Sequence, residues 1–144
     1  MTDVRIRTEP RTLHIQLAPG LALVDQACRA VRQFLDVREL GASTFDVLLL
    51  CREALCNAVL HGCGKRSAGM VHLRLELGEG PDSDWLTIRV ADTGSGFDWQ
   101  GCGRELPSEF EVSGRGLWII RAYCEDVAFN EAGNEITMRK RLTA

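Results

Sequence analysis

Hydrophobic and polar residues alternate in several short segments of the chain, and such alternation is the pattern of half-buried β-strands. In one of them, Leu13, Ile15 and Leu17 alternate with His14 and Gln16. The turn-like sequences GEGPDSD and EAGN each separate two of these segments, so we expect two hairpins there. The segments with strand character are residues 4–9, 13–18, 71–77, 86–90, 127–130 and 136–141.

Hydrophobic residues at intervals of three and four predict helices elsewhere in the chain. The first helix follows Pro19 and Gly20 and runs to about Val37. Its hydrophobic positions are Leu23, Ala27, Ala30, Val31, Phe34 and Leu35. A third helix, late in the chain, is marked by Leu117, Ile120 and either Tyr123 or Cys124.

A second helix is expected between these two, from about Thr44 to His61. Ser43 is a good N-cap residue, and Asp46 stands three positions later, where a capping box carries an acidic residue. Gly62 is expected to end the helix. Helices and strands are partly segregated along the chain, which predicts an α+β fold: a two-layer sandwich with helices on one face of a mixed, mostly antiparallel sheet.

Composition and charge narrow the class of protein. With 45% hydrophobic and 26% charged residues in 144, the chain resembles a soluble globular protein with one core, and we expect a single domain over residues 1–144. The formal charge is −3 and the longest Lys/Arg run is residues 139–141, which argues against direct nucleic-acid binding. We find neither a membrane-length hydrophobic run nor a signal-peptide core, so we expect a cytoplasmic protein that does not bind membranes.

Six cysteines are spread along the chain without a CxxC pair or a metal-ligand spacing. Cys51, Cys56 and Cys124 lie within hydrophobic helical patterns, where a free cysteine packs as a small apolar residue. We therefore expect reduced, structural thiols. Cys63 and Cys102 stand in glycine-rich segments and are the better candidates for exposed, reactive thiols.

One polar stripe interrupts the second predicted helix. Glu53, Asn57 and His61 follow one another at intervals of four and therefore share one face. A buried, unpaired carboxylate is unfavourable by several kcal/mol, so Glu53 faces either solvent or a cleft with compensating charge. A stripe facing solvent is the common case. In a cleft, Asn57 could offer an oxygen to a divalent cation, and Glu53 could orient or deprotonate a nucleophile.

Two glycine pairs follow the polar stripe. In IRVADTGSGFDW a predicted strand ends at Asp92, and Gly94 and Gly96 would let a ligand approach the backbone closely. In SGRGLWIIRAY, Gly114 and Gly116 immediately precede the third predicted helix, whose first N–H groups could bind phosphate. Alone, each pair is also explained by a plain turn or a flexible helix entry. Neither the P-loop nor the dinucleotide-binding pattern is present.

The order of the three motifs is more specific than any one of them. An E-x-x-x-N helix, a strand ending in D-x-G-x-G, and G-x-G at a helix start resemble the ATP-binding fold shared by gyrase-type, histidine-kinase and MutL ATPases. Within that superfamily, EALCNAVLHG, DTGSGFD and GRGLWII are similar to the motifs of the small anti-sigma factor serine/threonine kinases. The resemblance covers residues 5–142 and implies a histidine-kinase-like (Bergerat) ATPase fold.

The resemblance also implies roles for individual residues. Asn57 would ligate Mg²⁺ at the phosphates of ATP, and Glu53 would act as the base toward a serine hydroxyl of a protein substrate. Asp92 would accept a hydrogen bond from the adenine amino group. The other implied nucleotide-binding residues are His61, Gly94, Gly96, Gly114, Arg115 and Gly116. Lys65 and Arg104 are further candidates, because cations near the transferred phosphate could stabilise its charge.

The function implied by the resemblance is that of an ATP-dependent protein serine kinase that acts as an anti-sigma factor. Such a protein phosphorylates a STAS-type anti-anti-sigma partner, binds a sigma factor and forms a homodimer. Two alternatives stay open: an ATP-binding interaction module of the same fold that transfers no phosphate, and an adaptor domain that binds no nucleotide.

Overall fold

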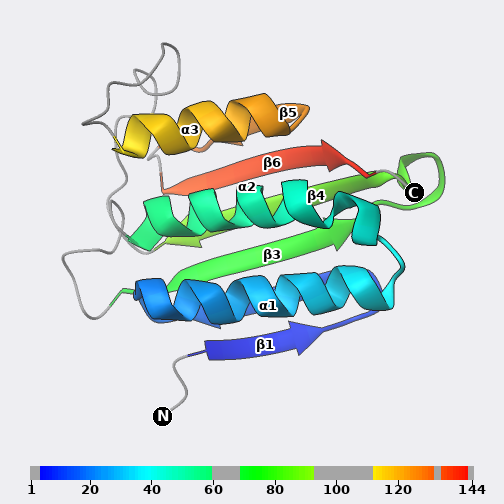
Figure 1. Ribbon diagram of the computed structural model, residues 1–144, viewed down its shortest axis with the longest axis horizontal. Helices are drawn as coiled ribbons and strands as arrows, with labels where there is room; N and C mark the ends of the chain where they lie inside the picture. The colour runs from blue at the N-terminus through cyan, green and yellow to red at the C-terminus, as the bar shows by residue number, and fades with distance from the viewer. Residues whose placement is uncertain (1–3, 60–68, 93–111, 132–133, 143–144) are drawn as a thin grey trace.

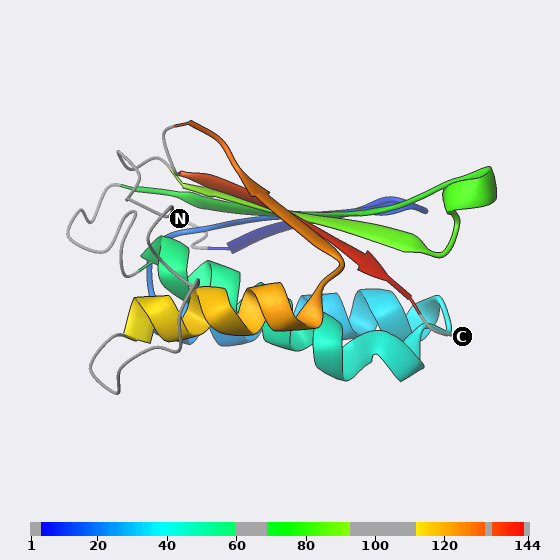
Figure 2. The same cartoon turned by 90° about the horizontal axis from the view of Figure 1, so that it is seen from above.

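The structure, a computed structural model, describes residues 4–59, 69–92, 112–131 and 134–142. These residues form a two-layer sandwich in which helices cover one face of a sheet (Figure 2). The α-helices are α1 (Leu21–Val37), α2 (Thr44–Asn57) and α3 (Val112–Tyr123), with short 3₁₀ turns η1 (Gly41–Ser43) and η3 (Gly80–Asp82). The strands are β1 (Val4–Thr8), β2 (Thr12–Leu17), β3 (Val71–Leu77), β4 (Trp85–Asp92), β5 (Asp126–Phe129) and β6 (Glu135–Arg141).

The sheet has six strands in the order β1-β2-β3-β4-β6-β5. Every strand pair within the described residues is antiparallel. The predicted α+β sandwich is therefore confirmed, but its described strands include no parallel pair of the kind that a mixed sheet has. Helix α1 packs on β1 and β2, α2 on β3 and β4, and α3 on β5 (Figure 1).

The core lies between the sheet and the helices, and period-two alternation determines which strand residues enter it. Leu13, Ile15 and Leu17 of β2 are all buried, as predicted, and so are Ile88 and Met138 of the central strands. Helix α1 has the predicted length, but its buried stripe is centred on Val24, Ala27, Cys28, Val31, Phe34 and Leu35. The predicted Leu23 and Ala30 are only partly buried, at the edges of that stripe.

The four cysteines within the described residues are free thiols, as predicted. Cys28 and Cys51 are buried, and Cys56 and Cys124 are partly buried. Burial raises the pKa of the Cys51 thiol above its ordinary value and raises the pKa of Cys124 to about 11, so both stay protonated at neutral pH. The two cysteines that we expect to be exposed, at positions 63 and 102, lie outside the described residues.

The start of α2 differs from the prediction. Ser43 occupies the N-cap position but forms no capping hydrogen bond with its side chain. Its φ of −96° and ψ of 0° are near-helical because it is the last residue of the turn η1, whereas a capping serine has extended backbone angles. Asp46, expected in a capping box, instead contacts Lys140 of β6, with Oδ2 and Nζ 3.3 Å apart.

The ends of α2 and α3 also differ from the expected positions. The α-helical part of α2 ends at Asn57, and the chain continues as π-helix at Ala58 and Val59. The predicted end at His61 and Gly62 lies outside the described residues. Helix α3 begins at Val112, so residues 114–116 lie within its first turns rather than before it.

Candidate functional site

Three elements that carry predicted site residues end or begin at the same end of the molecule. The C-terminal end of α2, the end of β4 and the N-terminal end of α3 lie together in both views (Figures 1 and 2). Helix α2 also packs directly against α3. The fold therefore brings the described parts of the three motifs, which are far apart in the sequence, to one end of the sandwich.

Helix α2 forms an ion pair on each of its flanks. On one flank, Nη2 of Arg52 lies 2.8 Å from Oδ1 of Asp25, a residue of α1. On the other flank, Asp46 contacts Lys140 of β6. Glu53 is seven residues after Asp46, and seven residues are almost two full helical turns, so the two carboxylates lie on the same flank. Asn57 follows one turn later. Glu53 and Asn57 therefore lie on the side of α2 that faces β6 and α3.

Glu53 is partly buried on this flank. Burial raises the pKa of its carboxyl group above the ordinary value, and the neighbouring Arg52 only partly opposes that effect. No cation of the described residues forms an ion pair with Glu53. A carboxylate with a raised pKa is a better proton acceptor than an ordinary one, which suits a general base.

Asn57 carries a buried polar atom with no partner. Its side-chain Nδ2 is inaccessible to solvent and has no hydrogen-bond acceptor within the described part of the chain. Buried polar groups in native proteins are nearly always satisfied, so an orphaned one indicates a site that is completed by another group. A half-turn of the amide exchanges nitrogen and oxygen, so the same position suits a bound oxygen atom or a bound cation.

Asp92 lies at the end of β4 on the face covered by helices. Leu86, Ile88 and Val90 are buried beneath the helices, and the alternation continues to Asp92. Its backbone N–H donates a hydrogen bond of 2.9 Å to the carbonyl oxygen of Asn134, so pairing with the chain beside β4 extends to this residue. The carboxylate is thus held by the sheet on the same side as Glu53 and Asn57.

Not all predicted site residues can be compared with the structure. Glu53, Asn57 and Asp92 lie at one end of the sandwich, and the backbone of residues 114–116 belongs to α3 at that same end. The predicted site residues that lie outside the described part are His61, Lys65, Gly94, Gly96 and Arg104. Arg52 and Asp25 have no sequence signal that relates them, because their contact joins two helices and depends on the tertiary fold.

The residues present fit a site for one Mg²⁺ ion shared with a phosphate ligand. No group of three or more His, Cys, Asp or Glu side chains within the described residues is arranged to hold a metal. Mg²⁺ commonly keeps several waters and takes only one or two protein ligands when phosphate oxygens supply the rest. The single carboxamide of Asn57, with its orphaned buried atom, meets that requirement.

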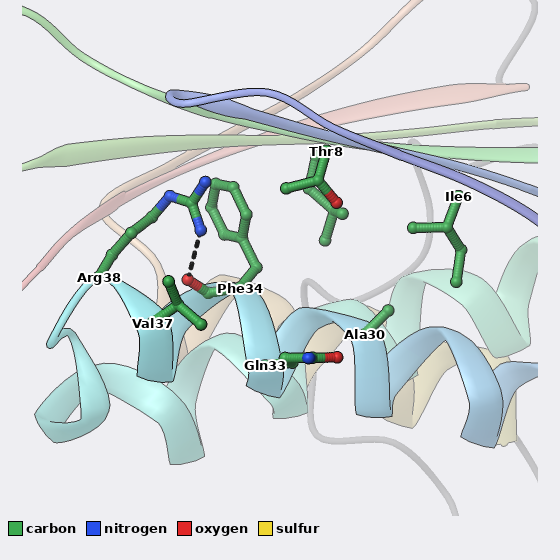
Figure 3. A pocket seen from close by; sticks show the side chains of 8 residues that line it. Ile6, Thr8, Ala30, Gln33, Phe34, Val37 and Arg38 are labelled. Carbon is green, nitrogen blue, oxygen red and sulfur yellow. Dashed lines mark hydrogen bonds between the residues drawn. The ribbon is translucent and has the colours of Figure 1, made fainter.

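A separate hollow of about 260 Å³ lies between β1 and α1 (Figure 3). It is lined by Ile6, Thr8, Leu13, Ala30, Gln33, Phe34, Val37 and Arg38. The guanidinium of Arg38 lies 3.7 Å from the ring centre of Phe34 and donates hydrogen bonds to the carbonyl oxygens of Glu9, Pro10 and Phe34. None of the predicted site residues lines this hollow, so it is distinct from the site on α2.

The burial of Glu53 predicts how stability depends on pH. Because its pKa is raised in the folded protein, Glu53 favours folding below its unfolded pKa of about 4.3, and that contribution is lost as the pH rises through the folded pKa. Glu53→Gln is therefore expected to raise the melting temperature at pH 8, with a smaller gain near pH 4.5. Thermal denaturation beside the exposed Glu131→Gln tests this. An equal gain in melting temperature at both pH values would contradict the view that burial of the charged Glu53 carboxylate destabilises the fold.

Comparison with known proteins gave two findings. A family model described as a histidine kinase-like ATPase domain matches residues 17–140. Among solved structures, the histidine kinase domain of the blue-light activated histidine kinase EL346 from Erythrobacter litoralis is similar, with a TM-score of 0.53 and 19% sequence identity. The match covers 88% of this chain and 62% of that one, and at this identity it concerns the fold alone.

No curated protein matches the sequence. Among the described residues, we find no helix that combines the length and the hydrophobicity needed to span a membrane.

Proposed function

The chain belongs to the histidine kinase-like ATPase domain family, and on that basis we propose that it is an ATP-dependent protein serine kinase that acts as an anti-sigma factor. Membership of the family implies ATP binding. The finer proposal, transfer of the γ-phosphoryl group to a protein serine, is supported by the three motifs and by the position of Glu53 beside Asn57 on α2.

The observation that carries the proposal is the partly buried Glu53 on the same flank of α2 as the orphaned amide of Asn57. In the proposed mechanism, Asn57 would hold Mg²⁺ through its side-chain oxygen, and Asp92 would accept a hydrogen bond from the adenine amino group. Glu53 orients the serine hydroxyl and accepts its proton. Mg-ATP, when bound, would supply the γ-phosphoryl group with ADP as the leaving group, and its Mg²⁺ would neutralise part of the phosphate charge.

The N-terminal end of α3 completes the proposed site. Gly114 belongs to its first turn, where N–H groups have no partner within the helix and the helix dipole favours an anion, and Arg115 and Gly116 follow directly. Within the proposal, these residues hold the phosphates of ATP opposite Asn57. Phosphoryl transfer depends mainly on positioning and charge stabilisation, so one base, one metal ligand and a set of N–H donors are sufficient.

The partners belong to the same proposal. The similarity of the three motifs to those of anti-sigma factor kinases supports a STAS-type anti-anti-sigma protein as the substrate and a sigma factor as the second partner. It also supports a homodimer that acts in the cytoplasm. Incubation of the purified protein with Mg-ATP and STAS-type partners tests the substrate, and size-exclusion chromatography with light scattering tests the dimer.

Calorimetric titration with ATP, with and without Mg²⁺, tests the binding site itself. Wild-type protein is expected to bind ATP more tightly with Mg²⁺, whereas Asn57→Ala is expected to bind without a response to Mg²⁺, because the metal loses its protein ligand. Gln26→Ala, which removes an exposed amide from α1, is the matched control. An Mg²⁺ response retained in Asn57→Ala would remove this residue from the metal site. Absence of ATP binding in all three proteins would overturn the proposed function.

A further inference from the structure

The described helices all lie on one face of the sheet, and none of them covers the opposite face (Figure 2). This open face is rich in arginine. Side chains alternate between the two faces along each strand, so the residues next to the buried ones belong to the open face. Its arginines are Arg5, Arg7, Arg74, Arg89, Arg139 and Arg141, and its acidic residues are Glu76, Asp126 and Glu135. The chain as a whole has a charge of −3, so this excess of cations is a local feature of the open face.

The strand register aligns four of the basic residues in one row. Arg7 is directly opposite His14, His14 is opposite Arg74, and Arg74 is opposite Arg89. Directly opposed side chains in antiparallel strands have Cβ atoms about 4.5 to 5.5 Å apart, and like charges in that position destabilise the sheet. Arg74 and Arg89 form such a like-charge pair, which lowers the stability of the free protein, and a bound anion would relieve the repulsion.

Neighbouring acidic groups neutralise this row only in part. Nη2 of Arg74 is 3.8 Å from Oε2 of Glu76, and Nε of Arg7 is 3.5 Å from Oε1 of Glu9. The side chains of both pairs are about half exposed or more, so these ion pairs are weak. Arg89 forms no ion pair with any acidic residue of the described chain. Burial lowers the pKa of the imidazole of His14, and the charges of His72, Arg7 and Arg74 lower it further. Part of this lowering thus comes from the positive charges that surround His14 on the open face.

The row ends in a hollow that suits the side chain of a ligand. A depression of about 400 Å³ is lined by Arg5, Ile6, Arg7, His14 and Gln16, at the edge of the sheet formed by β1 and β2. Guanidinium groups bind carboxylates through paired hydrogen bonds, and Gln16 adds a neutral donor and acceptor.

We propose that the open face of the sheet binds a carboxylate-rich segment of another protein, laid across β1 to β4 along the row from Arg7 to Arg89. A protein segment is favoured over a nucleic acid because single strands bind to sheets by stacking bases on exposed aromatic rings. Among the described strand residues of this face, Trp85 is the only tryptophan, tyrosine or phenylalanine, and the guanidinium groups of Arg139 and Arg141 already lie 4.6 and 4.9 Å from its ring centre. The rings of His14 and His72 lie near each other, with centroids 6.0 Å apart. The proposed surface is on the opposite side of the sheet from Glu53 and does not depend on nucleotide binding.

Fluorescence anisotropy with a labelled decaglutamate peptide tests the proposal on the whole protein. Arg89→Glu is expected to weaken peptide binding by about tenfold or more, because an attractive charge becomes repulsive. It is also expected to raise the melting temperature by about 1 to 4 °C, because the introduced carboxylate would face Arg74 as an opposite charge. Loss of binding together with a gain in stability distinguishes a binding surface from damage to the fold.

The matched control is Arg32→Glu, which makes the same change of charge at an exposed position on α1. It is expected to change peptide affinity by less than about twofold at an ionic strength of about 0.1 M, where distant charges are screened. Equal weakening by both variants, or no binding of the peptide to wild-type protein, would overturn the proposal. Tighter binding of single-stranded DNA than of the peptide, lost in Arg89→Glu, would assign the surface to nucleic acid instead.

Discussion

Glu53→Gln is expected to slow phosphoryl transfer to a serine of the partner protein by about 10²- to 10⁴-fold and to leave ATP affinity nearly unchanged. Glutamine keeps the size and hydrogen-bonding capacity of the side chain but cannot accept a proton. The carboxylate is partly buried on the flank of α2 that faces β6 and α3, and its pKa is raised, so in this site the glutamate is suited to proton transfer. Since only the transition state uses this property, the change should affect the rate and spare binding.

Single-turnover measurements with Mg-ATP and a STAS-type partner give the transfer rate, and calorimetry gives the affinity for ATP. Glu131→Gln makes the same chemical change at an exposed position and should transfer phosphate at the wild-type rate. Equal rates in wild type and Glu53→Gln would exclude Glu53 as the base. ATP binding without transfer in any of the proteins would instead indicate the interaction module that transfers no phosphate.

Asp92→Asn is expected to weaken ATP binding by about one to two orders of magnitude. A hydrogen bond to a charged acceptor contributes about 1.5 to 3 kcal/mol, and asparagine supplies only a neutral acceptor in the same place. The strand should be unaffected, because the backbone N–H of Asp92 still donates to Asn134. Aspartate and asparagine are also of nearly equal volume, so the substitution should not disturb the packing.

Titration with ATP and with GTP separates base recognition from a general loss of affinity. If Asp92 accepts a hydrogen bond from the amino group of adenine, Asp92→Asn should lose affinity for ATP and lose much of its preference for ATP over GTP. Asp126→Asn, at an exposed position of β5, is the control for the change in net charge. An unchanged dissociation constant for ATP in Asp92→Asn would exclude Asp92 from the nucleotide site.

The sheet and the first helix were predictable because their patterns are local. Period-two alternation identifies Leu13, Ile15 and Leu17 as core residues whatever the tertiary fold, since one face of the sheet is covered. Spacing also places Glu53 and Asn57 on one face of a helix. Which way that face points was not predictable, because it depends on the packing of α2 against the sheet and the other helices, which are formed by residues distant in sequence.

Tertiary context also explains the differences at the helix ends. The capping box at the start of α2 is absent because the preceding residues form the turn η1 and because Lys140 binds Asp46. The row of arginines on the open face has a similar origin. Arg74 and Arg89 each look like an ordinary exposed residue of an alternating strand, and only the register of β3 against β4 makes them direct neighbours.

The contacts of Arg38 have a consequence for how the protein opens locally. This one guanidinium joins the end of α1 to the turn between β1 and β2, through carbonyl groups 28 and 29 residues away in the chain. Edge hairpins commonly fray on their own, because few contacts hold them. Here, separation of β1 and β2 from the helix would break both of these hydrogen bonds together with the packing of α1 on the two strands. The hairpin and α1 are therefore expected to open together, so that a force applied to the N-terminal strand acts on the helix as well.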